Sequence, residues 1–235
     1  MNRRIGVLGG TFDPIHCGHL DLGEAAQRAL QLTSVLVMPS SRPPHRTAPL
    51  ASGFHRFAMA ALAIAGRTGW QVSDDELTHD ETSYTVTTLR RLHAEGYTSS
   101  ELFFVIGADA FLEFRSWKDY PQILEAARFA VVSRPGLRAS ELPDRLGDLA
   151  SRMTASFDST NPAGPSIILI EAETADVSST AIRQRCGEGR PLHGLVPASV
   201  EQHIEQHGLY RLPTQEQPEH RGMTNAAAGR LHGQS

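Results

Sequence analysis

Short segments that are apolar at nearly every position recur along this chain of 235 residues and constrain its fold more than any other feature. Such runs, bounded by turn residues, are typical of strands buried on both faces of a sheet. Segments with the helical spacing of apolar residues separate most of them. We therefore expect an α/β fold, a doubly wound parallel sheet with helices on both faces. The expected strands are 4–8, 34–39, 70–73, 101–107, 128–133 and 166–171, and the expected helices are 20–32, 54–65 and 84–95.

The pattern predicts one domain over residues 1–211. Segment 136–165 interrupts the alternation and is partly helical around 142–153, so we expect a peripheral insertion there. From residue 212 to 235 the chain is rich in Gln, Pro, Gly, Ala and His and has no hydrophobic periodicity. This composition predicts a disordered C-terminal tail.

Charge and cysteine content exclude some protein classes. The net charge is −4, whereas a general nucleic-acid binder is normally basic. The two cysteines, Cys17 and Cys186, form no disulfide framework and indicate a reduced, cytoplasmic protein. The first apolar run is too short for a secretion signal, and the longest, 57–65, is far below the ~20 residues of a membrane span. We expect neither a nucleic-acid nor a membrane partner, and leave a homo-oligomer open.

The segment GGTFDPIHCGHL, residues 9–20, joins the first expected strand to the first expected helix. Gly9 and Gly10 would let the backbone turn sharply and a ligand approach closely, and Gly18 would keep side-chain bulk away from the helix start. Free N–H groups at a helix N-terminus bind anions, and His16 and His19 would add donors to phosphoryl oxygens. A zinc site that includes Cys17, or a purely structural turn, are the alternatives.

A second candidate anion site lies in DVSSTAIR, residues 176–183. Ser178, Ser179 and Thr180 are favourable helix N-cap residues, and Arg183 follows one turn later. An ordinary capped helix with a solvated arginine would have the same sequence.

Together the two segments resemble the T/HxGH nucleotidyltransferase superfamily, and in particular its bacterial nicotinate-mononucleotide adenylyltransferases. GGTFDPIHCGH resembles the family's first motif and DVSSTAIR its ISSTxIR motif. Further similarities are PPHR at 43–46, SYTVTTL at 83–89, IGAD at 106–109 followed by Trp117, and SRPG at 133–136. Arg46 departs from the pattern, since lysine is more usual there, and a planar guanidinium does not make the same contacts as an ammonium.

The resemblance implies a Rossmann-like nucleotidyltransferase fold and transfer of the adenylyl group of ATP to nicotinate mononucleotide in NAD biosynthesis. His16, His19 and Arg183 would be catalytic. The resemblance also implies two sets of binding residues. The ATP and phosphate site would comprise Gly9, Gly10, Thr11, Phe12, Gly18, Ser178, Ser179 and Thr180. The nicotinate mononucleotide site would comprise His45, Arg46, Tyr84, Thr85, Asp109, Trp117 and Arg134. Mg²⁺ would arrive with ATP and take no protein side chain as a ligand.

Two other functions remain as alternatives. One is a different adenylyl- or cytidylyltransferase of the superfamily, such as a pantetheine-phosphate adenylyltransferase. The other is a catalytically silent nucleotide-binding regulator. Retention of both histidines and of Ser178–Arg183 disfavours the regulator, since a degenerate relative would be expected to lose at least one of them.

Overall fold

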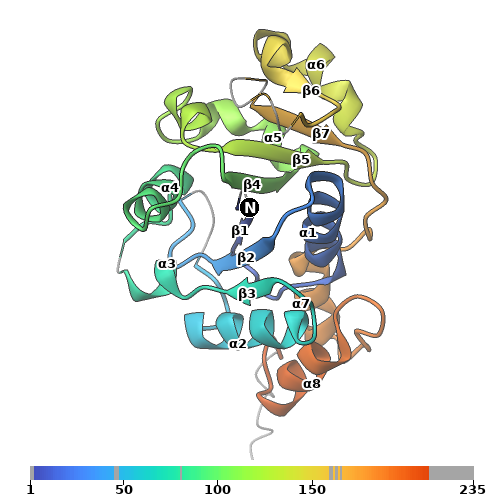
Figure 1. The fold of residues 1–235 in the computed structure, drawn as a ribbon. Helices are drawn as coiled ribbons and strands as arrows, with labels where there is room; N and C mark the ends of the chain where they lie inside the picture. The colour runs from blue at the N-terminus through green and yellow to red at the C-terminus, as the bar shows by residue number, and fades with distance from the viewer. Residues whose placement is uncertain are drawn as a thin grey trace, which may run out of the picture.

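The computed structural model describes residues 3–44, 48–79, 81–158, 161, 164 and 166–211, and the predicted tail from residue 212 lies outside them. Within these residues seven parallel strands form one sheet in the order β3-β2-β1-β4-β5-β7-β6 (Figure 1). The strands are β1 (Ile5–Gly10), β2 (Ser34–Pro39), β3 (Trp70–Val72), β4 (Leu102–Gly107), β5 (Arg128–Val132), β6 (Met153–Thr154) and β7 (Ile167–Ile170). The predicted doubly wound parallel sheet is confirmed.

Helices cover both faces of the sheet, with α1 on one side and α4 on the other (Figure 1). The α-helices are α1 (Cys17–Leu30), α2 (Gly53–Ile64), α3 (Asp75–Thr78), α4 (Thr85–Ala94), α5 (Ala108–Leu112), α6 (Leu142–Arg145), α7 (Ser179–Gly187) and α8 (Ala198–Gln206). In the described part of the chain, four short 3₁₀ turns lie at Phe114–Ser116, Gln122–Glu125, Ala139–Glu141 and Gly147–Arg152. Among the residues described, no helix combines the length and apolarity needed to cross a membrane.

Two apolar clusters form the core, one on each face of the sheet. The first packs α1, α2, α7 and α8 against the sheet, and the second packs α4, α5 and α6 against the opposite face. All six residues of β4 are buried. Burial on both faces explains why the strands are almost continuously apolar.

The strand order reverses beside β1, and this positions the site. Ile5 of β1 pairs with Ser34 of β2 on one side and with Leu102 of β4 on the other. In doubly wound sheets ligands bind beyond the carboxyl ends of the strands at such a reversal. The loops that follow β1 and β4 therefore form the expected binding edge.

Most predicted elements lie within a few residues of the observed ones. The first strand, expected over 4–8, extends through Gly9 and Gly10, which pair with Met38 and Pro39, and it ends at Gly10. In the predicted insertion 136–165, β6 extends the edge of the sheet beside β7, and Leu142 is fully buried.

Candidate nucleotide-binding site

The two histidines of the first motif meet at the start of α1. His16 is the N-cap residue in an extended conformation, and its N–H donates to His19 Nδ1 at 3.2 Å. The two rings stack with their centroids 3.6 Å apart. Because Nδ1 of His19 accepts a hydrogen bond, the proton of its neutral ring is assigned to Nε2, which makes Nε2 a donor.

His16 is buried and is held in its neutral form. Burial, followed by the positive charge of Arg134, lowers its pKa to about 4. Its Nδ1 is buried and has no hydrogen-bond partner among the described residues. A buried polar atom without a partner is costly unless a ligand or water completes it.

Gly18 allows Arg134 to approach this helix start. A Cβ at Gly18 would lie 3.0 Å from Arg134 Nη1, 3.1 Å from the Ala175 carbonyl oxygen and 3.3 Å from His16 Cε1. Arg134 Nη1 is itself buried and has no hydrogen-bond partner in the described part of the chain. These close contacts fit the predicted role of Gly18, because a side chain there would meet both the guanidinium and the backbone. The Arg134 guanidinium thus lies at the start of α1, beside His16.

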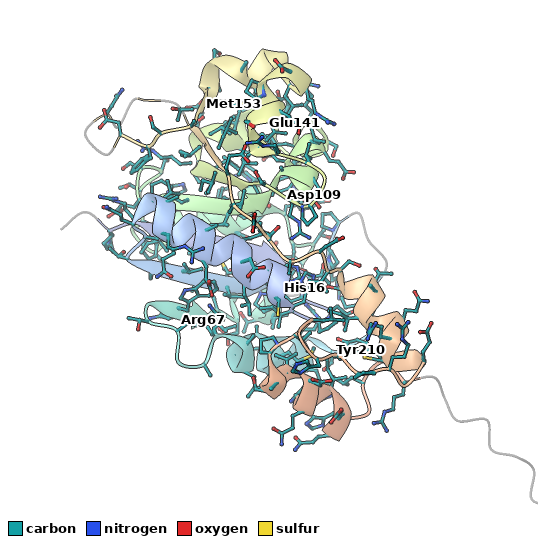
Figure 2. The ribbon with its side chains drawn as sticks, turned by 90° about the vertical axis from the view of Figure 1, so that its right-hand side faces the viewer. His16, Arg67, Asp109, Glu141, Met153 and Tyr210 are labelled. Carbon is teal, nitrogen blue, oxygen red and sulfur yellow. The ribbon has the colours of Figure 1, made fainter. Side chains whose placement is uncertain are left out.

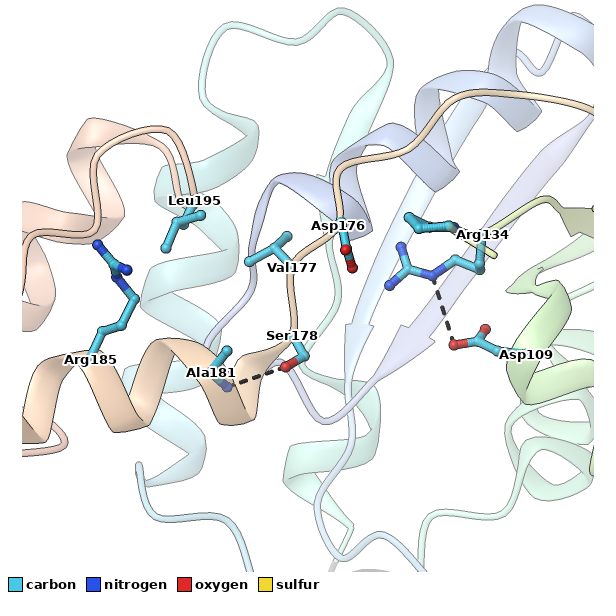
Figure 3. Close-up of a pocket in the computed structure, with 9 residues that line it drawn as sticks. Asp109, Arg134, Asp176, Val177, Ser178, Ala181, Arg185 and Leu195 are labelled. Carbon is cyan, nitrogen blue, oxygen red and sulfur yellow. Dashed lines mark hydrogen bonds and ion pairs between the residues drawn. The ribbon is translucent and has the colours of Figure 1, made fainter. Parts of the chain in front are cut away.

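Arg134 also borders a cavity of about 430 Å³ beyond the ends of β4 and β5 (Figure 3). Its Nε lies 3.8 Å from Asp109 Oδ2, and the Asp109 side chain remains 61% exposed. Figure 3 shows Asp109 and Asp176 on either side of the Arg134 guanidinium. The lining residues are Asp109, Arg134, Pro135, Asp176, Val177, Ser178, Ala181, Arg185 and Leu195.

The second motif forms the start of α7, as predicted. Ser178 is the N-cap, and its hydroxyl oxygen accepts from the Ala181 N–H at 3.2 Å. The Ser179 hydroxyl donates to the Pro14 carbonyl at 2.9 Å. Arg183 donates to the Asp13 carbonyl at 2.8 Å and to Thr180 Oγ1 at 3.1 Å. The structure therefore joins two motifs that are about 165 residues apart, through the loop before His16.

Asp13 anchors that loop. Its buried carboxylate accepts hydrogen bonds from the N–H groups of Leu50 and Ala51, at 2.8 and 3.0 Å. The Tyr210 hydroxyl donates to Asp13 Oδ1 at 2.8 Å. Burial, and then the Asp13 carboxylate, raise the pKa of Tyr210, so its phenol stays protonated and able to donate. Figure 2 shows Tyr210 and His16 at the same end of the molecule.

Sequence reasoning missed this anchor. Asp13 lies inside the first motif, and its acidic side chain among apolar neighbours was the available signal. Arg56, whose Nη1 donates to the Thr11 carbonyl at 2.7 Å, and Tyr210 gave no local signal. Both reach the loop from distant parts of the chain.

Gly9 and Gly10 also have a packing role that the sequence did not predict. A Cβ at Gly10 would lie 2.8 Å from the Phe12 ring, and one at Gly9 would lie 3.3 Å from Phe104. Both glycines therefore accommodate aromatic rings of the protein. Phe12 is 1% exposed and contacts the His19 ring edge-on, so its side chain supports His19 from the core.

The residues predicted for the mononucleotide lie partly elsewhere. Trp117 is half-buried and packs against Phe104 and Phe114. Tyr84 is the N-cap of α4, directly before Thr85, and Lys118 Nζ lies 4.3 Å from its ring centroid. None of these residues lines the cavity beside Arg134. His45 and Arg46 lie outside the described residues.

Comparisons with known proteins identify the family of this chain. The family model described as cytidylyltransferase-like matches residues 7–185. A Pseudomonas fluorescens protein named "probable nicotinate-nucleotide adenylyltransferase" is 39% identical over 214 residues, which is 91% of this chain and all of that protein. A Roseiflexus protein of the same name is 43% identical over 209 residues, covering 88% of this chain and 98% of its own length.

A solved structure shows the same fold. The nicotinic acid mononucleotide adenylyltransferase of Plasmodium falciparum, complexed with NaAD, superposes with a TM-score of 0.64 at 17% identity. The match covers 88% of this chain and 97% of that one. From the family model and the extensive sequence identity, we conclude that the chain belongs to the nicotinate-nucleotide adenylyltransferase family of cytidylyltransferase-like proteins.

Proposed function

We propose that this protein transfers the adenylyl group of ATP to nicotinate mononucleotide, releasing pyrophosphate and forming nicotinate adenine dinucleotide. The observation that carries the proposal is a pair of buried nitrogens beside the N-terminus of α1, His16 Nδ1 and Arg134 Nη1, which find no hydrogen-bond partner among the residues that the structure describes. Hydrogen-bond donors and positive charge converge there, as a polyphosphate requires. The names of the relatives point to the same reaction.

The reaction needs no covalent enzyme intermediate. An oxygen of the mononucleotide phosphate attacks the α-phosphorus of ATP, and the bond from that phosphorus to the β-bridging oxygen breaks. Pyrophosphate departs with the electron pair. Because a phosphate monoester is already ionised at neutral pH, catalysis consists of positioning and charge stabilisation.

His16, His19 and the first N–H groups of α1 would hold the α-phosphate. His16 is neutral at pH 7 because its pKa is about 4, so it would donate one hydrogen bond without adding charge. Arg134 lies beside it and would supply the fixed positive charge. Removal of one well-placed donor of this kind costs about 2.7–4 kcal/mol of transition-state stabilisation.

The start of α7 would hold the departing phosphates. Thr180 and Arg183 lie one helical turn apart on one side of α7, and Arg183 already bonds to Thr180 Oγ1. Since Arg183 also donates to the Asp13 carbonyl, it would link the leaving-group side to the loop that carries His16. We assign it both a binding and a positioning role.

The donor set fits Mg²⁺ that arrives on the nucleotide. Imidazole, guanidinium, hydroxyl and N–H groups form the phosphate cradle, and these recognise phosphate oxygens. The carboxylates that line the cavity are those of Asp109 and Asp176, and Asp109 has Arg134 beside it. The ion would be held by the triphosphate and water, and when bound it neutralises charge on the phosphates.

For the acceptor, Trp117 and the start of α4 form the proposed pyridine site. The N–H groups of Thr85 and Val86 belong to the first turn of α4, where no preceding turn supplies an acceptor. They would bind the nicotinate carboxylate, while Trp117 stacks on the ring and Asp109 binds a ribose hydroxyl.

Cys17 and Cys186 are free thiols, as expected of a protein in the reducing cytoplasm, which is the location we propose.

The test follows pyrophosphate release with ATP, Mg²⁺ and one of three acceptors. We expect nicotinate mononucleotide to react much faster than nicotinamide mononucleotide or 4′-phosphopantetheine. Preference for phosphopantetheine would overturn the acceptor and keep the phosphate site. ATP binding without turnover of any acceptor would indicate the regulator instead.

A further inference from the structure

Three histidines meet where α2 and α8 pack together, and none of them lines the cavity beside Arg134. His55 is in the first turn of α2, while His203 and His207 lie one turn apart at the end of α8. Their nearest ring nitrogens all lie within 4.8 Å of one another. His55 Nδ1 and His203 Nε2 are 3.1 Å apart.

We propose that His55, His203 and His207 bind a divalent transition-metal ion, with Zn²⁺ as the best match. Imidazole nitrogens are preferred ligands of Zn²⁺ at about 2.0–2.1 Å, and three protein ligands with water in a fourth position form a stable tetrahedral set. Tetrahedral geometry at that bond length places ligand nitrogens about 3.3 Å apart. The 3.1 Å pair is close to this spacing, and small ring rotations would bring in the third nitrogen.

The surrounding packing holds the ligands in place before a metal binds. Ser199 at the start of α8 donates to the Leu62 carbonyl at the end of α2, at 3.1 Å. Together with the His55–His203 contact, this shows that the two helices run antiparallel and touch at both ends. Val200 and Ile204 of α8 are buried in the same cluster as Met59 and Ala63 of α2. A metal would therefore meet preorganised ligands rather than fold a loose segment.

The site is chemically distinct from the histidine pair at α1. His207 is exposed and His55 and His203 are half-buried, so a metal reaches them directly from solvent. His16, by contrast, is 3% exposed and lies beside the cationic Arg134, which disfavours another cation. The inference is therefore independent of the proposed adenylyl transfer.

The chain segments beside His55 and His207 both contact the loop that contains Thr11 and Asp13. Arg56, next to His55, donates to the Thr11 carbonyl, and Ala51 before α2 donates to the Asp13 carboxylate. Tyr210, three residues after His207, donates to the same carboxylate. A bound metal would cross-link the two segments that hold Asp13, and its role would be structural.

The test measures Zn²⁺ binding to the full chain without an added histidine tag, by competition with a chromophoric chelator. We expect one equivalent to bind, and His207→Ala to weaken binding at least ~10-fold, because loss of an outer-sphere partner alone often costs that much. His207→Ala is the first variant because this side chain is exposed, and the buried apolar contact between α2 and α8 does not include it. His79→Ala, at another exposed histidine, should bind as the wild type does.

Two further measurements distinguish this site from the nucleotide site. His16→Ala/His19→Ala should retain the equivalent of Zn²⁺, and Co²⁺ should give the visible absorption of a four-coordinate ion in the wild type but not in His55→Ala. Zn²⁺ should also raise the melting temperature of the wild type more than that of His207→Ala. Equal Zn²⁺ affinity of wild type and His207→Ala, or loss of binding in the His16/His19 variant, would overturn the proposal.

Discussion

The side chains of His16 and Arg134 both lie against Gly18, and His16 Nδ1 and Arg134 Nη1 are buried nitrogens without a hydrogen-bond partner in the part of the chain described. A Cβ at Gly18, in the first turn of α1, would lie 3.0 Å from Arg134 Nη1 and 3.3 Å from His16 Cε1, and the charge of Arg134 contributes to the low pKa of His16. Such an arrangement is unfavourable in the free protein unless water or an anion completes it.

Replacement of Arg134 by alanine should lower kcat/KM by about 10²–10³, because one preorganised charged donor is lost. Arg134→Lys should recover part of the rate, since it keeps the charge but loses the planar set of donors. Initial rates of pyrophosphate release measure both variants. Arg152→Ala, at an exposed arginine paired with Glu125, is the control and should match the wild type. Full activity in Arg134→Ala would contradict the assignment.

Gly18→Ala should reduce activity at least ~10-fold, while a gain in helix propensity of about 1 kcal/mol offsets part of the strain that the added Cβ causes. The added Cβ would lie 3.0 Å from Arg134 Nη1 and 3.1 Å from the Ala175 carbonyl, so it would displace the guanidinium. The matched control is Gly147→Ala, where a Cβ meets nothing within 4 Å. Steady-state kinetics with varied ATP test this, and an unchanged KM for ATP together with an unchanged kcat would refute the role of Gly18.

The buried neutral His16 predicts a loss of stability in acid. Its folded pKa, about 4, is below the unfolded value of 6.5, so between these pH values the unfolded chain binds more protons. The contribution of His16 to the free energy of unfolding is therefore fully present above pH 6.5. As the pH falls from 6.5 towards 4, this contribution is lost, and the free energy of unfolding decreases by up to roughly 3 kcal/mol.

Denaturant unfolding of wild type and His16→Asn at several pH values isolates this contribution. The difference in unfolding free energy between the two proteins should shift in favour of the variant as the pH falls. A difference that stays constant from pH 7 to pH 4 would show that His16 titrates normally.

Tyr210→Phe should lower the free energy of unfolding by about 1.5–3 kcal/mol, the range for a hydrogen bond to a charged group. The lost bond, from the Tyr210 hydroxyl to Asp13 Oδ1, connects the last described residues to the loop before His16. Tyr120→Phe removes a hydroxyl that donates to the exposed Asp148 at 3.2 Å and should have a smaller effect. Equal destabilisation by the two variants would argue against a special role for the Asp13 anchor.

The sequence predicted the sheet well because buried parallel strands have a local signature. Segment 34–39 matches β2 at both ends, and the start of α7 falls at the serines predicted to cap it. The helix α8 was not predicted, and the two-residue β6 is defined by pairing with β7, which no local pattern encodes.

The sequence predicted the two motifs of the site, but the hydrogen bonds that join these motifs form only in the folded protein. Arg183 reaches Asp13 across 170 residues and Tyr210 reaches it across 197. Arg134 was predicted to bind the mononucleotide, and only the close approach at Gly18 shows that it lies beside His16. His55 and His203 are 148 residues apart, and their contact likewise depends on the fold and not on a local sequence pattern.

The most direct test of the central claim compares pyrophosphate release by wild type, His16→Ala and His79→Ala, with ATP, Mg²⁺ and nicotinate mononucleotide. We predict that the wild type and His79→Ala release pyrophosphate at equal rates, and that His16→Ala loses about 10²–10³ in rate. A His16→Ala protein that folds and retains the wild-type rate would contradict the assignment of this helix start as the phosphate site.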